Sequence, residues 1–146
     1  MTERKRVLIL CTGNSARSQM AEGLLREMGG DGVEAASAGV APTQVRAEAI
    51  EAMKEIGIDI SDHRSKSSDE FANQPFDYVI TVCDNAQQQC PTFPGATRRI
   101  HWPLEDPATV TGDHEARLQA FRVARDELRE RLGEFVKSEL KAPERS

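Results

Sequence analysis

The sequence predicts a single α/β domain, in which a four-stranded parallel sheet is covered by helices on both faces. Short β-rich apolar segments alternate along the chain with segments whose apolar residues recur at helical spacing. This alternation is typical of parallel sheets, because their crossover connections place helices on the sheet faces. The length of 146 residues suits one core. We therefore expect residues 1–146 to form one domain, with residues 141–146 frayed.

Four apolar segments are the predicted strands. Residues 6–10 are β-rich and apolar, as expected for a central strand that is buried on both faces. The other strands are predicted at residues 32–38, 76–82 and 97–102. Ligands of parallel sheets lie beyond the carboxyl ends of the strands, so residues far apart in the sequence can meet there.

Helices are predicted between and after these strands. Apolar residues after position 17 recur at helical spacing, and Gly29 with Gly30 ends that helix. A second helix is predicted from residue 43 or 44 to 56, where Gly57 stops it, and a short one at 67–73. A long amphipathic helix is predicted at 113–140, whereas the pattern leaves the state of residues 84–90 open.

The composition limits the possible partners. The net charge is −5, with acidic and basic residues interspersed, which gives no electrostatic reason to bind nucleic acid or an anionic membrane. The longest apolar run, residues 7–11, is far too short to span a bilayer, and no signal-peptide pattern follows the N-terminus. We therefore expect a cytoplasmic protein. It is expected to be a monomer, since no exposed apolar stripe is evident.

A loop between the first strand and the first helix has the features of an oxyanion site. Gly13 and Asn14 tolerate the curled backbone that lets several amides point at one centre. The following helix directs its positive dipole end at the same centre. The residues that we expect to bind the oxyanion are Thr12, Gly13, Asn14, Ser15, Ala16, Arg17 and Ser18.

Cys11 opens this loop and is the predicted nucleophile. A free thiol is only a few per cent ionised at neutral pH, but convergent amides, a helix dipole and a guanidinium all favour the thiolate. Arg17 supplies that guanidinium and can bind two oxygens of a tetrahedral anion. Ser18 can donate a hydrogen bond to the sulfur. We therefore expect Cys11 to face the bound anion as a thiolate.

The segment from Cys11 to Glu22 resembles the low-molecular-weight protein tyrosine phosphatases and their arsenate reductase relatives. The resemblance extends over nearly the whole chain, in the order of motifs and of strands and helices. Two positions depart from the phosphatase pattern. Those phosphatases usually carry a second cysteine just before the arginine, where this chain has Ala16, and often a proline where it has Gln19.

Two further cysteines, Cys83 and Cys90, bracket a polar segment that ends at Pro91. Their spacing differs from that of a usual zinc site. If the segment is helical, the two Cα atoms are separated by about 10 Å, whereas a disulfide needs them within about 7 Å. The two cysteines can therefore form a disulfide only if this segment unwinds.

The segment from Cys83 to Pro91 resembles the redox segment of thioredoxin-coupled arsenate reductases. The resemblance implies that the chain reduces arsenate to arsenite. Cys11 attacks arsenate, a Cys11–Cys83 disulfide forms, and a Cys83–Cys90 disulfide then replaces it. No bound cofactor is implied; the external dithiol reductant is thioredoxin, with a glutaredoxin–glutathione route left open.

Asp106 completes the predicted catalytic residues. It lies beside Pro107 shortly after the last strand, where a carboxylate can protonate a departing oxygen, although Asp-Pro is also a common turn. The resemblance assigns the general acid of the family to Asp106. Two alternatives remain open: a phosphatase, which gives Cys83 and Cys90 no role, and an oxyanion or redox sensor without turnover.

No metal site is predicted, because no set of His, Asp and Glu residues has the spacing of metal ligands. Some arsenate reductases bind potassium near the loop through residues that match Asn14, Glu22 and Ser37. Their further ligands fall near Arg64 and Lys66, which are cationic here. We therefore expect no potassium site, and we expect the Lys66 ammonium to take its role.

Overall fold

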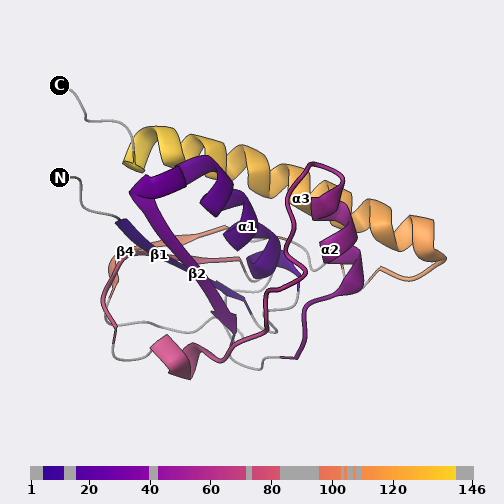
Figure 1. Ribbon diagram of the computed structural model, residues 1–146, viewed down its shortest axis with the longest axis horizontal. Coiled ribbons are helices and arrows are strands. Elements are labelled where there is room, and N and C mark those ends of the chain that lie inside the picture. Colours follow the sequence, from indigo (N-terminus) through magenta and orange to yellow (C-terminus); the bar gives the residue numbers. More distant parts are fainter. Residues whose placement is uncertain are drawn as a thin grey trace.

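A computed structural model of the chain describes residues 5–11, 16–39, 43–71, 74–82, 96–102, 104, 107 and 110–140. These residues contain one four-stranded sheet in the order β2-β1-β3-β4, and every neighbouring pair of strands is parallel. Figure 1 shows the helices α1, α2 and α3 together on one side of this sheet. The predicted fold class, a single four-stranded parallel sheet with helices, is confirmed, but among the described residues the three α-helices lie on one face and only the short helical segment Ser68–Phe71 packs on the other.

The strands and helices follow one another in the predicted order. The strands are β1 Lys5–Cys11, β2 Val33–Gly39, β3 Phe76–Thr81 and β4 Ala96–His101. The α-helices are α1 Arg17–Gly29, α2 Ala47–Lys54 and α3 His114–Phe135. Shorter helical segments are the 3-10 helices η1 Gly30–Gly32 and η2 Ser68–Phe71, and the π-helical η4 Val136–Leu140.

β1 is a central strand because its side chains are buried on both faces of the sheet. Val7 and Ile9 point to one face and Leu8 and Leu10 to the other, and none is more than 1% exposed. β1 pairs with β2 on one side and β3 on the other. The carboxyl ends of these strands therefore lie at the same edge of the sheet, directly below the start of α1.

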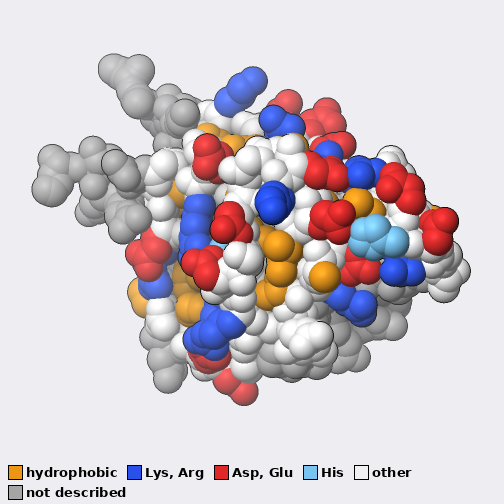
Figure 2. All heavy atoms as spheres, turned by 45° about the vertical axis from the view of Figure 1, so that its right-hand side comes forward, with side chains coloured by type: hydrophobic (Ala, Val, Ile, Leu, Met, Phe, Trp, Pro, Cys, Tyr) orange, Lys and Arg blue, Asp and Glu red, His pale blue; other side chains and the backbone are white. Residues whose placement is uncertain are grey.

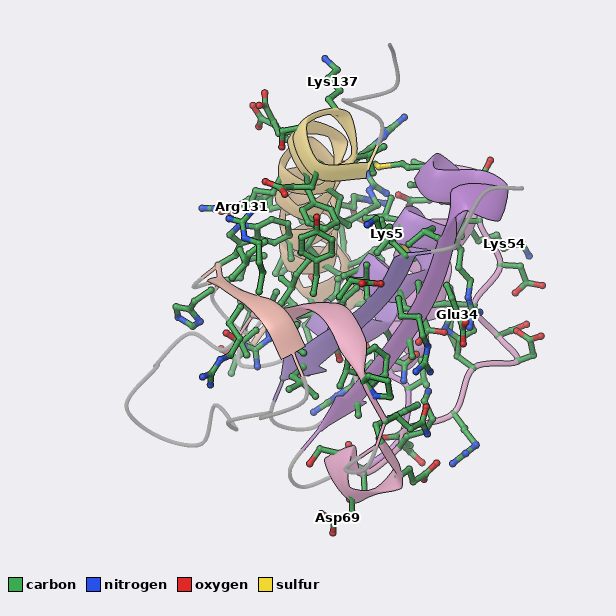
Figure 3. The ribbon with its side chains drawn as sticks, turned by 90° about the vertical axis from the view of Figure 1, so that its left-hand side faces the viewer. Lys5, Glu34, Lys54, Asp69, Arg131 and Lys137 are labelled. Atoms are coloured by element: carbon green, nitrogen blue, oxygen red, sulfur yellow. The ribbon has the colours of Figure 1, made fainter. Side chains whose placement is uncertain are left out.

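The two faces of the sheet carry different layers. The face of Val7 and Ile9 packs against the apolar residues of α1, α2 and α3 in one core cluster. The face of Leu8 and Leu10 packs against Phe71 of η2. Figure 3 shows the sheet between α3 on one side and η2, with its labelled Asp69, on the other.

α2 is shorter than the sequence predicts. The predicted start at residue 43 or 44 is wrong, because the helix begins at Ala47 after Arg46, which is extended (φ −73°, ψ 140°). The Thr43 amide donates a hydrogen bond to Ser65 Oγ (3.0 Å), which attaches this residue to the segment before η2. The helix also ends at Lys54, two residues before the predicted end, and the chain then turns at Gly57, whose φ of +84° favours glycine as predicted.

α3 is the predicted long amphipathic helix. Asp113 caps its N-terminus by accepting a hydrogen bond from the Ala116 amide (2.9 Å). The predicted apolar stripe is buried, with Leu118, Phe121 and Leu128 between 0% and 2% exposed. The last predicted turns form the π-helical η4 instead of continuing the α-helix.

Ion pairs join the polar sides of α2 and α3. Arg117 contacts Glu48 at 3.2 Å, and Arg122 contacts Glu55, which immediately follows α2, at 2.7 Å. Figure 2 shows acidic and basic side chains interspersed over the face that it displays. This arrangement agrees with the charge pattern of the sequence.

Some predictions fall outside the described residues, namely the state of 84–90, the fraying of 141–146 and the last two residues of the short helix at 67–73. The rest of that short helix is the 3-10 helix η2. Among the described residues, no helix combines the length and the apolar character that a membrane crossing requires.

Candidate active site

Cys11 is the last residue of β1 and lies under the first turn of α1. Its side chain is 1% exposed, and its Sγ lies 2.9 Å from Ser18 Oγ, which is fully buried. The sequence predicts this contact. The serine hydroxyl can donate a hydrogen bond to the sulfur, and no bulk water competes with it at this position.

The start of α1 offers backbone donors beside the same sulfur. Ala16 is the N-cap residue, and its side chain makes no capping hydrogen bond. The first amides of a helix have no partner within the helix and carry part of the positive end of its dipole. A tetrahedral anion placed at this end would accept hydrogen bonds from those amides, as the sequence predicts for residues 16–18.

Arg17 is the first residue of α1, and its guanidinium is held in place by backbone carbonyls. The residue is 5% exposed, and its Nη1 donates to Val82 O (3.2 Å) and to Leu104 O (3.0 Å). These carbonyls follow β3 and β4 respectively. One guanidinium therefore joins the ends of three strands, because α1 itself follows β1.

The two carbonyls that Arg17 contacts belong to residues that lie close in the sequence to the other predicted catalytic residues. Val82 directly precedes Cys83, and Leu104 lies two residues before Asp106. Cys83, Cys90 and Asp106 lie outside the described residues, as do the loop residues Thr12, Gly13, Asn14 and Ser15. Their predicted roles therefore stay predictions.

A buried ionic cluster lies one turn further along α1. Glu22 is 2% exposed and accepts a hydrogen bond from the fully buried Ser37 of β2, with 2.5 Å between Ser37 Oγ and Glu22 Oε1. The other carboxylate oxygen pairs with Arg26 (2.5 Å), and Lys66 Nζ lies 3.9 Å from Oε1. Burial lowers the pKa of Lys66, and the nearby Glu22 carboxylate opposes that shift.

These contacts test the fit of a potassium ion. Both carboxylate oxygens of Glu22 already face cations, Arg26 and Lys66, and its Oε1 also accepts from Ser37. A further cation at this point would be repelled by two positive charges. The described residues therefore do not fit potassium. No group of three or more His, Cys, Asp or Glu residues suited to a metal gathers in the described part of the chain either.

The sequence did not indicate the contacts of Gln19 and His63. Gln19 is fully buried, and its side-chain amide donates to Arg64 O (2.9 Å), while its Oε1 lies 3.0 Å from His63 Nδ1. Burial lowers the pKa of His63, and Arg26 Nη1 lies 3.3 Å from its other ring nitrogen. The segment before η2 is thus attached to the first turn of α1, directly after Ser18.

Residues 6–145 match the family described as low molecular weight phosphotyrosine protein phosphatase. The chain belongs to this family. The match begins in β1 and includes the Cys11–Ser18 loop, so the family and the site described above coincide in the sequence. The predicted resemblance to this family is confirmed.

Several members of the family that resemble this chain are arsenate reductases. The arsenate reductase of Halalkalibacterium halodurans is 42% identical over 135 residues, which cover 92% of this chain and 97% of that protein. A solved arsenate reductase in the phosphate binding state has a TM-score of 0.79 and 32% identity, over 90% of this chain and 96% of the other. The thioredoxin-dependent arsenate reductase of Corynebacterium glutamicum has a TM-score of 0.71 and 31% identity, over 93% of this chain and 62% of the other.

Proposed function

We propose that this protein is an arsenate reductase that converts arsenate to arsenite with three cysteines. The observation that carries the proposal is the buried Cys11–Ser18 pair beside Arg17 at the start of α1, in a chain whose relatives are arsenate reductases. The solved relative in its phosphate binding state supports an oxyanion site in this fold. Phosphate and arsenate have the same tetrahedral shape and charge, so the same donors suit both.

In the first step, the Cys11 thiolate attacks the arsenic atom of bound arsenate. Arg17 and the amides of the loop hold the arsenate oxygens, and Ser18 stabilises the thiolate before attack. A new S–As bond forms and one As–O bond breaks. Asp106 donates a proton to the departing arsenate hydroxyl, which leaves as water.

In the second step, the Cys83 thiolate attacks the Cys11 sulfur. The S–As bond breaks, and its electron pair stays on arsenic, which becomes As(III) and departs as arsenite. The two thiolates lose two electrons in total and become the Cys11–Cys83 disulfide. The contact between Arg17 and the carbonyl of Val82, the residue before Cys83, supports an approach of this cysteine to Cys11.

In the third step, Cys90 attacks Cys83 and releases Cys11 as a thiolate. The resulting Cys83–Cys90 disulfide is reduced by an external dithiol, for which thioredoxin is proposed. The thioredoxin-dependent relative supports this choice. A glutaredoxin–glutathione system is the other possible reductant, and no bound cofactor takes part.

A low-molecular-weight phosphatase is the second candidate function, and the description of the family favours it. Cys11, Arg17 and Asp106 would then hydrolyse a phosphate ester through a cysteinyl-phosphate. Ala16 replaces the second loop cysteine that such phosphatases usually carry. Weak phosphatase activity is expected of the reductase as well, because the first attack is the same.

A coupled assay tests the proposal. The purified protein is mixed with arsenate, thioredoxin, thioredoxin reductase and NADPH, and NADPH oxidation is followed. The parent protein should show sustained arsenate-dependent oxidation. The Cys90→Ser variant should lose it but still release arsenite once, because only the last exchange needs Cys90. Sustained turnover by Cys90→Ser would eliminate the three-cysteine relay.

The cellular setting completes the proposal. We expect the protein to act as a monomer in the cytoplasm, where thiols are kept reduced and thioredoxin is available. Arsenate is its substrate and thioredoxin its protein partner; nucleic acid and membranes have no part in the reaction.

A further inference from the structure

The carboxylate of Glu22 is a buried charge that needs nearby cations. Only 2% of the residue is exposed, and an isolated carboxylate in such a place is costly unless it is paired and hydrogen-bonded. Arg26 pairs with one carboxylate oxygen from a side chain that is itself 53% exposed. The Lys66 side chain is only 13% exposed, and its ammonium lies 3.9 Å from the other oxygen. Lys66 is therefore the inner of the two cations.

Lys66 also connects the segment that carries it to two elements of the site. Its backbone carbonyl accepts from the Gly39 amide at the end of β2 (2.9 Å). Its Nζ donates to Arg64 O (3.0 Å), the same carbonyl that accepts the side-chain amide of Gln19 in the first turn of α1. The ammonium thus lies where α1, β2 and this segment meet.

We propose that Lys66 is a positioning residue, whose ammonium is the permanent internal countercation of Glu22 and holds the first turn of α1 in place. That turn carries Arg17 and Ser18, so Lys66 acts on the oxyanion site through them. The protein consequently needs no monovalent metal ion at this point. Only the kinetic part of this proposal rests on the proposed function.

The surroundings of Lys66 also predict that truncation of its side chain opens a space beside Glu22. Glu22, Arg26 and Lys66 line a surface cleft of about 440 Å³, and the exposed Glu34 of β2, labelled in Figure 3, lines it too. Truncation of Lys66 would leave a buried carboxylate and hydroxyl at a cleft open to solvent. A weakly hydrated cation such as potassium or ethylammonium can enter such a space and replace the lost charge more readily than the strongly hydrated sodium ion.

Two variants separate the charge of Lys66 from its volume. Lys66→Ala removes the ammonium and its aliphatic stem, whereas Lys66→Met removes the charge but keeps a side chain of similar length. Only the alanine variant has room for an added cation. Lys54→Ala is the matched control, because Lys54 is an exposed lysine at the end of α2 (Figure 3).

Each protein is measured in sodium, potassium and ethylammonium chloride at equal ionic strength. Thermal unfolding reports stability, and arsenite release in a single turnover without reductant reports the site. In sodium chloride, both Lys66 variants should unfold about 5 °C below the parent protein, because the buried Glu22 carboxylate keeps Arg26 but loses the inner of its two countercations. Both should also release arsenite more slowly.

The rescue pattern decides the proposal. Potassium or ethylammonium should restore stability and rate in Lys66→Ala, but not in Lys66→Met, and should leave the parent protein and Lys54→Ala unchanged. Equal responses of the two Lys66 variants, or activation of the parent protein by potassium over sodium, would overturn it. If the thermal pattern appears but the parent protein releases no arsenite, the proposed function fails and the role of Lys66 stands.

Discussion

The contact between Ser18 and Cys11 gives a quantitative prediction for the Ser18→Ala variant. Ser18 Oγ lies 2.9 Å from Cys11 Sγ, and the two residues are 0% and 1% exposed, so no bulk water can replace the lost hydroxyl. A hydrogen bond to a charged group contributes about 1.5–3 kcal/mol, which corresponds to a roughly 10- to 150-fold lower rate of thiolate attack.

Rapid mixing of the reduced variant with saturating arsenate near neutral pH measures this rate as arsenite release in a single turnover. Alkylation of Cys11 by iodoacetamide, measured in parallel, reports thiolate reactivity without arsenate and should slow to a similar extent. Ser138→Ala is a matched control, because Ser138 is exposed on η4. A folded Ser18→Ala protein that reacts within about twofold of the parent protein would refute the role of this hydrogen bond.

Three other substitutions each test one structural feature. Arg17→Lys keeps the charge but loses the planar fork, and its single-turnover arsenite release should fall about 100-fold. The hydrogen bond from Arg122 lowers the pKa of Glu55 from 4.5 to about 2, so the ionised carboxylate stabilises the folded protein above pH 4.5. Thermal melts at several pH values should show that Glu55→Gln is less stable than the parent protein above pH 4.5, and that this difference vanishes as the pH falls towards 2. Gly57→Ala should cost about 1–2 kcal/mol in urea unfolding, because Gly57 has φ +84°. Gly133→Ala is its control: it lies inside α3 with open space at its Cβ, and it should gain up to about 1 kcal/mol.

The sequence predicts the order of the elements well because local signals agree with the packing. The apolar run of β1 is buried on both faces, and Asp113 caps α3 at the predicted start of the long helix. The start of α2 is the main error. Periodicity continues through Val45, but Arg46 is extended and the helix begins only at Ala47. The Thr43 amide donates to Ser65 Oγ, and such a contact between residues far apart in the chain leaves no local signal.

The candidate site is predictable only where residue type carries the chemistry. Cys11, Arg17 and Ser18 have functional side chains at a strand-to-helix turn, and the structure brings them together. The carbonyls of Val82 and Leu104 hold Arg17, but a backbone carbonyl is present at every residue and cannot be singled out in a sequence. The Glu22 cluster is predictable in part: its charged and polar residue types can be read in the sequence, but which of them are in contact depends on the fold.

The most direct test of the central claim is a single turnover of the reduced protein with arsenate and no added reductant, with disulfides mapped by mass spectrometry. The proposed relay predicts about one equivalent of arsenite and a Cys83–Cys90 disulfide, because each arsenate takes two electrons from two thiolates. If no arsenite forms while the same sample hydrolyses an aryl phosphate, the protein is a phosphatase, and Cys83 and Cys90 have no catalytic role.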